Sequence, residues 1–330
     1  MINLRPGRPN NDFMKVLITG GAGFIGSHLA EAMCRRGAQV LALDNLSLGD
    51  VANLDAARQC GGSALEFIEG DVADEALLKK IVPGCDWVFH EAALPSVPRS
   101  VAQPVESNQQ NLDATLRLLV AARDARVKRF LFASSSAIYG DVDEPRKHER
   151  LPPNPLSPYA LQKYAGEKYG QLFHRLYGLE TVGLRYFNVF GPRQAFDSPY
   201  SGVIAKFCTA MLAGRRPTIF GDGLQSRDFT YIDNVVSANL LAAEAPAEKV
   251  AGRFFNVGAG QNISLLQLVA ELNRLTGQTL APLFEPPRTG DVRSSLADIS
   301  AAQAALGYQV RITWQTGLER TLNFYRGLKD

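Results

Sequence analysis

The sequence has few of the features that mark metal-binding, disulfide-bonded, membrane or nucleic-acid-binding proteins. Its four cysteines, Cys34, Cys60, Cys85 and Cys208, form no CxxC pair and have no histidine at metal-ligand spacing. We therefore expect reduced packing residues, without zinc or disulfides. No apolar stretch reaches the roughly 18 residues that a membrane-spanning helix needs. The 35 basic and 33 acidic residues form no run of one sign, which indicates neither nucleic acid nor a membrane as partner.

The N-terminal thirteen residues differ in composition from the rest of the chain. Residues 1–13 (MINLRPGRPNNDF) are rich in Pro, Asn and Arg and lack the apolar segment of a secretory signal. We expect them to be an extension before an alternative start at Met14, and we expect the protein to be cytoplasmic. With 330 residues, of which 46% are hydrophobic, the chain can form one large or two fused α/β domains.

Short apolar runs alternate with helix-like segments along the chain. Ser27 to Arg36 has helical spacing. Buried strands are predicted at residues 15–19 (KVLIT), 38–43 (AQVLAL), 87–93 (WVFHEAA), 129–135 (RFLFASS) and 181–188 (TVGLRYFN). The alternation predicts an α/β fold, a Rossmann-type doubly wound parallel sheet with a smaller C-terminal α/β lobe. We place the Rossmann domain at residues 14–180, with 229–248 returning to it, and the second domain mainly at 181–330.

A glycine-rich loop follows the first predicted strand. Gly20, Gly23 and Gly26 lie in GGAGFIGSH, where glycines permit a tight turn, close approach of a pyrophosphate and close helix packing. Such loops also occur as ordinary tight turns. Asp44 ends the second strand, where its carboxylate can accept hydrogen bonds from both hydroxyls of an adenosine ribose and would repel a 2′-phosphate. Together these residues predict NAD as cofactor, rather than NADP.

Three further groups of residues also lie at the ends of predicted strands and could contact the same cofactor. Asp71 in EGDVAD follows another strand and can meet an adenine amino group, or can cap the helix that begins in DEALLKKI. Ala92 and Ala93 end a strand with small side chains, against which a flat cofactor can lie. The serines at 134–136 end the next strand, and a serine there can donate a hydrogen bond to a reacting oxygen.

The segment SPYALQKYAGEK, residues 157–168, contains Tyr-x-x-x-Lys twice, as Tyr159 with Lys163 and Tyr164 with Lys168. Residues five apart lie about 140° apart around a helix, so both pairs cannot serve one site. Tyr159 follows Pro158 and falls in the first turn, where the helix dipole favours a phenolate. Lys163 adds a cation that is expected to lower the pKa of the phenol and can hold a nicotinamide ribose.

These motifs together resemble a known family. GGAGFIG, LDN, GDVAD, SSSAIYG, SPYALQK, LRYFNVFGPRQ, SRDFTYIDNV and RTGDVRSSLADIS extend from residue 15 to about 300. The chain is similar to the extended short-chain dehydrogenases/reductases, specifically the nucleotide-sugar 4-epimerases. The resemblance implies Ser135, Tyr159 and Lys163 as catalytic residues and leaves Tyr164 as a packing residue. It also implies a reaction in which the sugar is transiently oxidised at C4 by bound NAD and then reduced on its other face.

The resemblance further implies two sets of binding residues and no metal. Phe187 would lie beside the nicotinamide, Asn188 would contact the diphosphosugar, and Arg227 and Arg288 would clamp the diphosphate. The expected cofactor-binding residues are Gly20, Gly23, Phe24, Ile25, Gly26, Asp44, Asn45, Ser47, Gly49, Asp71, Val72, Ala92, Ala93, Asn111, Tyr159, Lys163 and Phe187. The expected substrate-binding residues are Ser96, Ser135, Ser136, Asn188, Val203, Arg227, Arg288 and Ser295.

The substrate is a UDP-sugar by resemblance, and one residue bears on which sugar it is. In the similar 4-epimerases the residue seven after the diphosphate-binding arginine walls the sugar pocket, and here that residue is Ser295. A small wall residue admits an acetamido group, which favours UDP-N-acetylglucosamine and UDP-N-acetylgalactosamine, with UDP-glucose and UDP-galactose also accepted. Ser294 departs from the histidine expected beside it, and Ser295 could instead be a small loop residue. UDP-N-acetylglucosaminuronic acid and UDP-glucuronic acid are the alternatives.

Two alternative functions can be compared with the residues of this chain. Related dehydratases and decarboxylases carry a carboxylate where this chain has Ser136 and Ala137, and eliminating water needs such an acid and base. A non-catalytic NAD-sensing protein of the same fold would usually lose the Tyr/Lys pair that this chain retains.

The resemblance also implies a homodimer through a four-helix bundle, formed by helices at residues 108–126 and 157–176 of each subunit.

Overall fold

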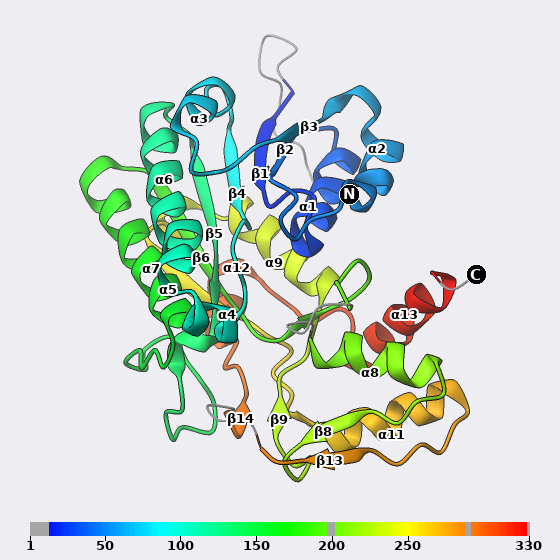
Figure 1. The fold of residues 1–330 in the computed structure, drawn as a ribbon. Coiled ribbons are helices and arrows are strands. Elements are labelled where there is room, and N and C mark those ends of the chain that lie inside the picture. The colour runs from blue at the N-terminus through cyan, green and yellow to red at the C-terminus, as the bar shows by residue number, and fades with distance from the viewer. Residues whose placement is uncertain (1–12, 197–201, 288–291, 329–330) are drawn as a thin grey trace.

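A seven-stranded parallel sheet forms the centre of the larger lobe (Figure 1). The computed structural model describes residues 13–196, 202–287 and 292–328. The strand order is β11-β6-β5-β4-β1-β2-β3, which confirms the predicted Rossmann-type fold. The strands are β1 Lys15–Thr19, β2 Gln39–Asp44, β3 Leu65–Glu69, β4 Trp87–His90, β5 Arg129–Ser135, β6 Glu180–Tyr186 and β11 Arg253–Val257.

Helices cover both faces of this sheet, because each strand points alternate side chains to opposite sides. Val16 and Ile18 of β1 pack into the core on one face, and Leu17 packs into a separate core on the other. The first face is covered by α1 Phe24–Arg35, α2 Asp55–Gly61 and α9 Ile232–Glu244. The second is covered by α3 Glu75–Ile81, α6 Ala114–Asp124 and α7 Pro158–Tyr177. Both faces are buried, so the inner strands are continuous apolar runs.

Two predicted helices begin at residues other than those expected. Helix α1 begins at Phe24 rather than Ser27, so Gly26 lies within its first turn. The helix expected at 108–126 begins earlier, as α5 Pro104–Asn108, because proline suits the first position of a helix. It then passes through a π-helical turn, Gln109–Asp113, before α6. Such turns occur mostly as single insertions in helices.

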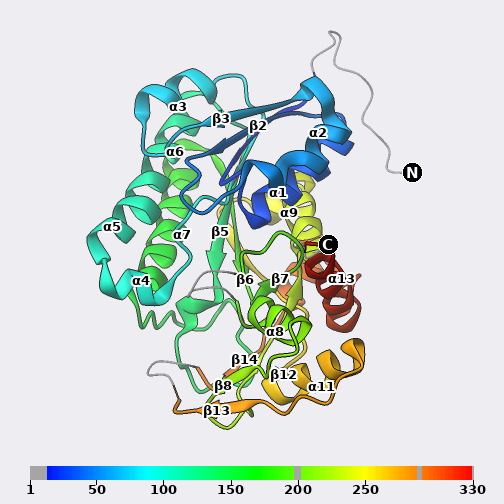
Figure 2. The same ribbon diagram turned by 45° about the vertical axis from the view of Figure 1, so that its right-hand side comes forward.

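The smaller lobe is built from short strands and the helices that pack beside them (Figure 2). Two small sheets in this lobe have the order β12-β9-β14 and β13-β8, and a separate two-stranded sheet pairs β10 Thr230–Tyr231 with β7 Val189–Phe190. The strands are β8 Thr218–Phe220, β9 Ser226–Arg227, β12 Ile263–Ser264, β13 Leu283–Glu285 and β14 Ser294–Ser295. The helices are α8 Val203–Leu212, α11 Leu265–Thr276 and α13 Trp314–Gly327. The carboxylate of Asp228 ties these segments together, because it accepts hydrogen bonds from the backbone N–H groups of Ala259, Gly260 and Ala297.

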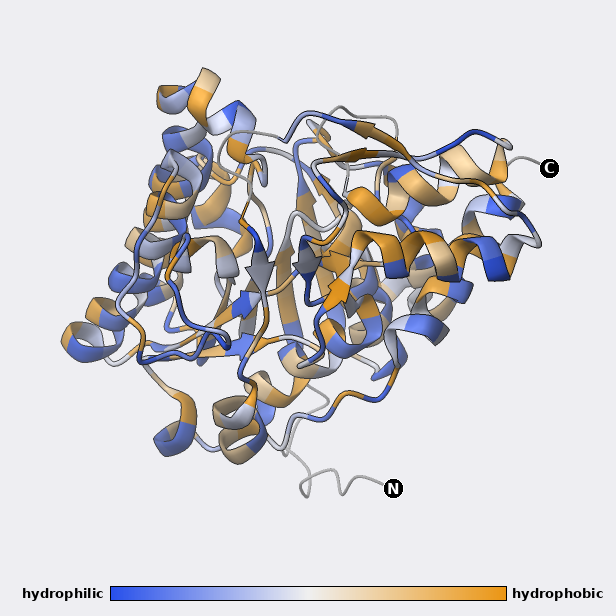
Figure 3. Ribbon diagram, turned by 90° about the horizontal axis from the view of Figure 1, so that it is seen from below, coloured by the Kyte–Doolittle hydropathy of each residue, from blue (hydrophilic) through white to orange (hydrophobic). Residues whose placement is uncertain are grey.

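Figure 3 shows hydrophobic residues along the inner strands and mixed hydrophobic and hydrophilic sides on the outer helices. Among the helices of the described residues, none combines the length and the hydropathy that a membrane span requires. Cys34, Cys85 and Cys208 are buried. The expectation that all four cysteines are packing residues is wrong for Cys60 of α2, which is exposed.

Candidate active site

The carboxyl ends of the parallel strands meet at one edge of the sheet, and most of the predicted site residues lie there. In an open α/β sheet this edge forms the ligand-binding crevice, at the point where the strand order reverses. Here the order reverses at β1, which lies between β4 and β2. The glycine loop follows β1, Asp44 ends β2, Ala92 and Ala93 follow β4, and Ser135 ends β5.

The glycine loop leaves no room for side chains where it meets the strand ends. Gly20 has φ +66°, and a Cβ atom on it would lie 2.8 Å from the backbone nitrogen of Ala92. A Cβ atom on Gly26 would lie 2.1 Å from the carbonyl oxygen of Gly20. Gly23 is the N-cap of α1, and no side-chain hydrogen bond caps this end of the helix. The backbone N–H groups of the first turn, which includes Phe24 and Ile25, can therefore bind a phosphate.

Asp44 lies beside this helix end, at the carboxyl end of β2. Its Oδ2 atom accepts a hydrogen bond from Ala22 N at 3.0 Å, and Oδ1 accepts one from Leu46 N at 2.8 Å. Burial raises the pKa of Asp44, and the backbone N–H donors oppose that shift. Gly49 packs against the carboxylate, since a Cβ atom there would lie 2.8 Å from Asp44 Oδ1. Asp44 thus organises its own loop as well as presenting a carboxylate next to the glycine loop.

Asp71 and the loop after Asp44 together form one rim of the site at the sheet edge. Its Oδ2 atom accepts a hydrogen bond from Asn45 Nδ2 at 3.0 Å, and Asn45 Oδ1 accepts one from Ser47 N at 3.1 Å. The N-cap of α3 is Asp74, whose side chain accepts from the backbone of the first turn. Asp71 does not cap this helix. It holds the turn after β3, where Val72 is buried, against the loop after β2.

Asn111 lies in the π-helical turn, and its side chain is occupied by protein groups. Its Oδ1 atom accepts from Leu94 N at 2.7 Å, and its Nδ2 atom donates to Gln162 Oε1 at 2.8 Å. These bonds join the loop after β4 to α7. The structure therefore places Asn111 behind the loop that carries Ala92 and Ala93, where it positions that loop.

Tyr159 lies in the first turn of α7, as its sequence predicts. The side chain of Ser157 caps the helix, Pro158 occupies its first position, and Tyr159 N donates to Ser100 Oγ at 3.1 Å. The side chain of Ser135 lies near enough to the Tyr159 hydroxyl to lower the pKa of the phenol. Lys163, one turn along α7, donates from Nζ to the carbonyl oxygen of Ala133 at 2.8 Å. Ser135, Tyr159 and Lys163 are thereby brought together at the carboxyl end of β5.

The pKa shifts at this cluster are dominated by burial. Burial raises the pKa of Tyr159, and the hydrogen bond with Ser135 lowers it. The expected net lowering of the phenol pKa by Lys163 is therefore wrong for the protein groups alone, because desolvation of the phenolate is the larger effect. Burial also lowers the pKa of Lys163 to about 8, and the negative charge of Glu91 opposes this shift.

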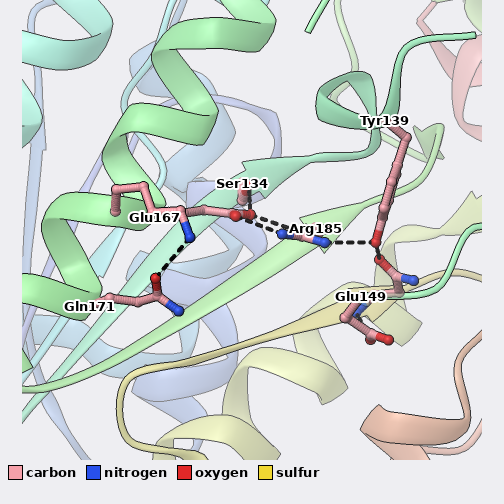
Figure 4. A network of polar contacts seen from close by, with 8 residues as sticks. Ser134, Tyr139, Glu149, Glu167, Gln171 and Arg185 are labelled. Atoms are coloured by element: carbon pink, nitrogen blue, oxygen red, sulfur yellow. Dashed lines mark hydrogen bonds and ion pairs between the residues drawn. The ribbon is translucent and has the colours of Figure 1, made fainter. Parts of the chain in front are cut away.

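A buried polar network supports the cluster from behind (Figure 4). Glu167 lies one further turn along α7 and forms a bidentate pair with Arg185 of β6, at 2.8 and 2.7 Å. Ser134 Oγ donates to Glu167 Oε1 at 2.6 Å, which links the pair to the strand that carries Ser135. Arg185 Nη1 donates to the Tyr139 hydroxyl at 2.8 Å, and Tyr139 donates to Asn256 Oδ1 at 2.7 Å. The network fixes α7 against β5 and β6.

The second tyrosine–lysine pair has a different environment. Tyr164 is half-buried against the small cluster of Ile138 and Phe187. Lys168 is exposed and donates from Nζ to Gln171 Oε1 at 3.1 Å. The Tyr164 ring therefore packs in the protein, while its lysine points to solvent.

The predicted substrate residues come from both lobes. Phe187 is buried after β6, and the next residue, Asn188, has φ +22°. In the smaller lobe Arg227 of β9 lies opposite Ser295 of β14, in parallel register. Ser96 caps a short helix, α4 Val97–Ala102, Ser136 begins the 3-10 turn Ser136–Tyr139, and Val203 begins α8. Arg288 lies outside the described residues.

One acidic residue was missed as a site candidate. Glu91 follows β4, and its Oε1 atom accepts a hydrogen bond from the Tyr186 hydroxyl at 2.9 Å. The signal in the sequence was a carboxylate inside the apolar run FHEAAL, which is costly to bury without a reason. Within the described ranges no cluster of three or more His, Cys, Asp or Glu residues could hold a metal ion.

Comparisons with known proteins agree with this site. The model of the NAD dependent epimerase/dehydratase family matches residues 16–258. The UDP-glucose 4-epimerase of Mycolicibacterium smegmatis is 39% identical over 319 residues, which are 95% of this chain and 99% of that protein.

Two solved structures are also similar. The UDP-N-acetylglucosamine 4-epimerase from Methanobrevibacter ruminantium, in complex with UDP-N-acetylmuramic acid, has a TM-score of 0.90 at 39% identity, covering 96% of this chain and 99% of its own. The UDP-glucuronic acid 4-epimerase from Bacillus cereus, in complex with UDP-glucuronic acid and NAD, has a TM-score of 0.88 at 32% identity, covering 96% and 100%.

Proposed function

Because the chain belongs to the NAD-dependent epimerase/dehydratase family, we propose that it interconverts UDP-N-acetylglucosamine and UDP-N-acetylgalactosamine. Its activity as an NAD-dependent UDP-sugar 4-epimerase follows from its relatives. NAD would bind between the glycine loop and Asp44, in the Rossmann domain of residues 14–180 and 229–248, and the sugar nucleotide would bind mainly to residues 181–330.

The residues at the sheet edge fit this cofactor. The uncapped start of α1 can hold the pyrophosphate, since Gly20 and Gly26 let the backbone approach closely. Asp44 can accept both ribose hydroxyls of the adenosine. NAD supplies the acceptor for a hydride from C4 of the sugar. Asn45, Asp71 and Ala92 complete the rim against which the cofactor would lie.

Tyr159 would take the proton of the sugar 4-hydroxyl, either directly or through Ser135. The proximity of these two side chains, through which Ser135 lowers the pKa of Tyr159, supports such a transfer. Lys163 would hold the nicotinamide ribose and place a positive charge near the phenolate. The 4-keto sugar would then turn about its diphosphate linkage and regain the hydride on its other face, with Tyr159 returning the proton.

The choice of sugar depends on the contact between β14 and β9. Ser295 lies opposite Arg227, the arginine proposed to hold the diphosphate, and its small side chain would leave space for a 2-acetamido group. The relative from Methanobrevibacter ruminantium, named for UDP-N-acetylglucosamine, supports this choice. The relative from Bacillus cereus makes UDP-glucuronic acid the second candidate.

A panel of UDP-sugars tests the proposal. Purified enzyme is incubated separately with UDP-N-acetylglucosamine, UDP-glucose, UDP-glucuronic acid and UDP-N-acetylglucosaminuronic acid, and the anomeric proton of each product is followed by NMR. The expected result is the highest kcat/KM for UDP-N-acetylglucosamine, with the 4-epimer as product. A higher kcat/KM for either uronic acid would refute the choice of sugar while leaving the epimerase assignment in place.

We also propose a homodimer that forms through α7 and the helix beside it. Leu161, Leu172 and Leu176 are exposed on α7 and fall within about 60° around its axis. Val105 on the neighbouring α5 is 71% exposed. An exposed apolar stripe across two packed helices is typical of a surface that another copy covers.

A further inference from the structure

Glu91 has a buried carboxylate that the proposed reaction does not use. Its Oε1 atom accepts the hydroxyl of Tyr186, which in turn accepts a hydrogen bond from Asn239 Nδ2 at 2.8 Å. Its Oε2 atom is inaccessible to solvent and has no hydrogen-bond partner among the described residues. A buried oxygen left without a partner lowers the stability of the fold and calls for an explanation.

The sheet register places Glu91 close to Lys163. His90 of β4 lies opposite Phe132 of β5, so the next residues along, Glu91 and Ala133, lie side by side at the strand ends. The carbonyl oxygen of Ala133 is the atom that accepts the Lys163 ammonium. Lys163 is only 3% exposed, so its charge is poorly solvated and sensitive to a neighbouring anion.

The two groups shift each other in opposite directions. Burial lowers the pKa of Lys163 to about 8, and Glu91 raises it. Burial raises the pKa of Glu91 to about 7, while the Tyr186 hydroxyl and Lys163 lower it. Above neutral pH a charged Glu91 therefore favours the charged form of Lys163.

The other titratable groups around the pair do not supply this negative charge. His90 bonds through both ring nitrogens to Thr19 and Thr115; burial and Lys163 lower its pKa to about 3. Burial raises the pKa values of Tyr159 and Tyr186. The carboxylate of Glu167 is held by Arg185 and Ser134.

We propose that Glu91 is a positioning residue for the epimerase reaction, whose carboxylate keeps Lys163 protonated beside Tyr159. The inference rests on the proposed function for its catalytic meaning, because a neutral Lys163 would no longer favour the phenolate. The electrostatic coupling between Glu91 and Lys163 can be measured without any turnover. Glu91→Gln is the variant of choice, since it keeps the shape of the side chain and an acceptor for Tyr186 while removing the charge.

The first experiment reads the charge of Lys163 directly. Holoenzyme is labelled with lysine carrying 13C at Cε, and the signal of Lys163 is assigned by its absence from Lys163→Arg. In Glu91→Gln the titration midpoint of this signal should fall by about 1 pH unit or more. Tyr186→Phe is the intermediate case, because losing the hydrogen bond raises the pKa of Glu91 and leaves less of its carboxylate charged; its midpoint should fall by less than that of Glu91→Gln. An unchanged midpoint in Glu91→Gln would overturn the inference.

The second experiment reads the consequence for catalysis. The alkaline limb of the pH profile of kcat/KM should move to lower pH in Glu91→Gln by the same amount as the NMR midpoint. A lowered NMR midpoint with an unmoved alkaline limb would overturn the positioning role. Activity in Tyr159→Phe equal to the wild type would instead refute the proposed function, and the NMR result would still report on the Glu91–Lys163 pair.

A third readout separates this role from a structural one. Burial raises the pKa of Glu91 from 4.5 to about 7, because the fold tolerates the neutral carboxyl group better than the carboxylate. The resulting contribution to the free energy of unfolding is fully present below about pH 4.5. It is lost as the pH rises through about 7. Glu91→Gln should therefore unfold at a higher temperature than the wild type near pH 8.5 and at a similar temperature near pH 4.5. A variant that is less stable at both pH values would mark Glu91 as a structural residue and contradict the inference.

Discussion

The Nζ atom of Lys163 lies 5.9 Å from the centre of the Tyr159 ring, one turn farther along the same helix. The pair Lys168 and Tyr164 has a similar separation of 5.2 Å. Spacing along the helix therefore does not distinguish the two pairs. Their surroundings do, because Lys163 is buried and Tyr159 lies beside Ser135, whereas Lys168 is exposed.

Replacing each tyrosine in turn tests this distinction. Tyr159→Phe removes the proposed proton acceptor and should lower kcat by about 10²–10⁴, the usual contribution of a positioned acid–base group. Tyr164→Phe removes a hydroxyl from a packing residue and should leave kcat within about twofold of the wild type. Thermal unfolding of both variants controls for stability. A larger loss of kcat in Tyr164→Phe at equal stability would show that the other pair does the chemistry.

Ser295→Tyr tests the proposed wall of the sugar pocket. A tyrosine beside Arg227 should overpack the pocket for a 2-acetamido group by about 1–3 kcal/mol. The corresponding loss in kcat/KM for UDP-N-acetylglucosamine is roughly 5- to 150-fold, with UDP-glucose largely spared. Both kcat/KM values are measured for the wild type and the variant, with Ser294→Tyr as the matched neighbour. Equal losses on the two sugars, or no loss on either, would show that Ser295 does not wall the pocket.

The buried pair of Glu167 and Arg185 should matter chiefly for stability. Glu167→Gln leaves the guanidinium buried without an anion and should lower the free energy of unfolding by about 3–5 kcal/mol. The matched control is Glu271→Gln, since Glu271 pairs with the exposed Arg274 on α11; a surface pair contributes about 0–1 kcal/mol. Urea unfolding of the two variants gives both values. Similar small losses would mean that Arg185 finds other partners.

The exposed stripe on α7 predicts a change of mass in solution. Wild-type enzyme should give a light-scattering mass of two subunits. Leu172→Glu places a charge in the stripe and should shift the equilibrium toward one subunit, because a charge at the core of an interface is strongly disfavoured. Leu224→Glu, an exposed leucine of the smaller lobe, is the control and should stay dimeric. A wild-type mass of one subunit would rule the proposed dimer out.

The parts of the fold that could be predicted are those encoded by local sequence. Strand β5 was predicted to its end residues at 129–135 because a strand buried on both faces is a continuous apolar run. The strands of the smaller lobe, such as β9 and β14, contain two residues each, too few to show alternation. Their positions are set by contacts with Asp228 and by each other.

The site residues that could be predicted are likewise those that belong to local sequence motifs. Glycine spacing and the Tyr-x-x-x-Lys pattern are local, so Gly20, Tyr159 and Lys163 could be named from the sequence. For Glu91 the sequence shows only a carboxylate inside an apolar run, because its partner Tyr186 is 95 residues away. The direction of the Tyr159 pKa shift was mispredicted for a related reason: it depends on burial, which the helix alone does not reveal.

The central claim is that epimerisation proceeds by reversible oxidation at C4 with return of the same hydride. It is tested most directly with UDP-N-acetylglucosamine carrying deuterium at C4, converted by the purified holoenzyme in ordinary water. The account predicts that the product, UDP-N-acetylgalactosamine, retains the deuterium at C4. Tyr159→Phe should form this product only at its reduced rate. Exchange of the deuterium for solvent hydrogen during conversion would contradict it.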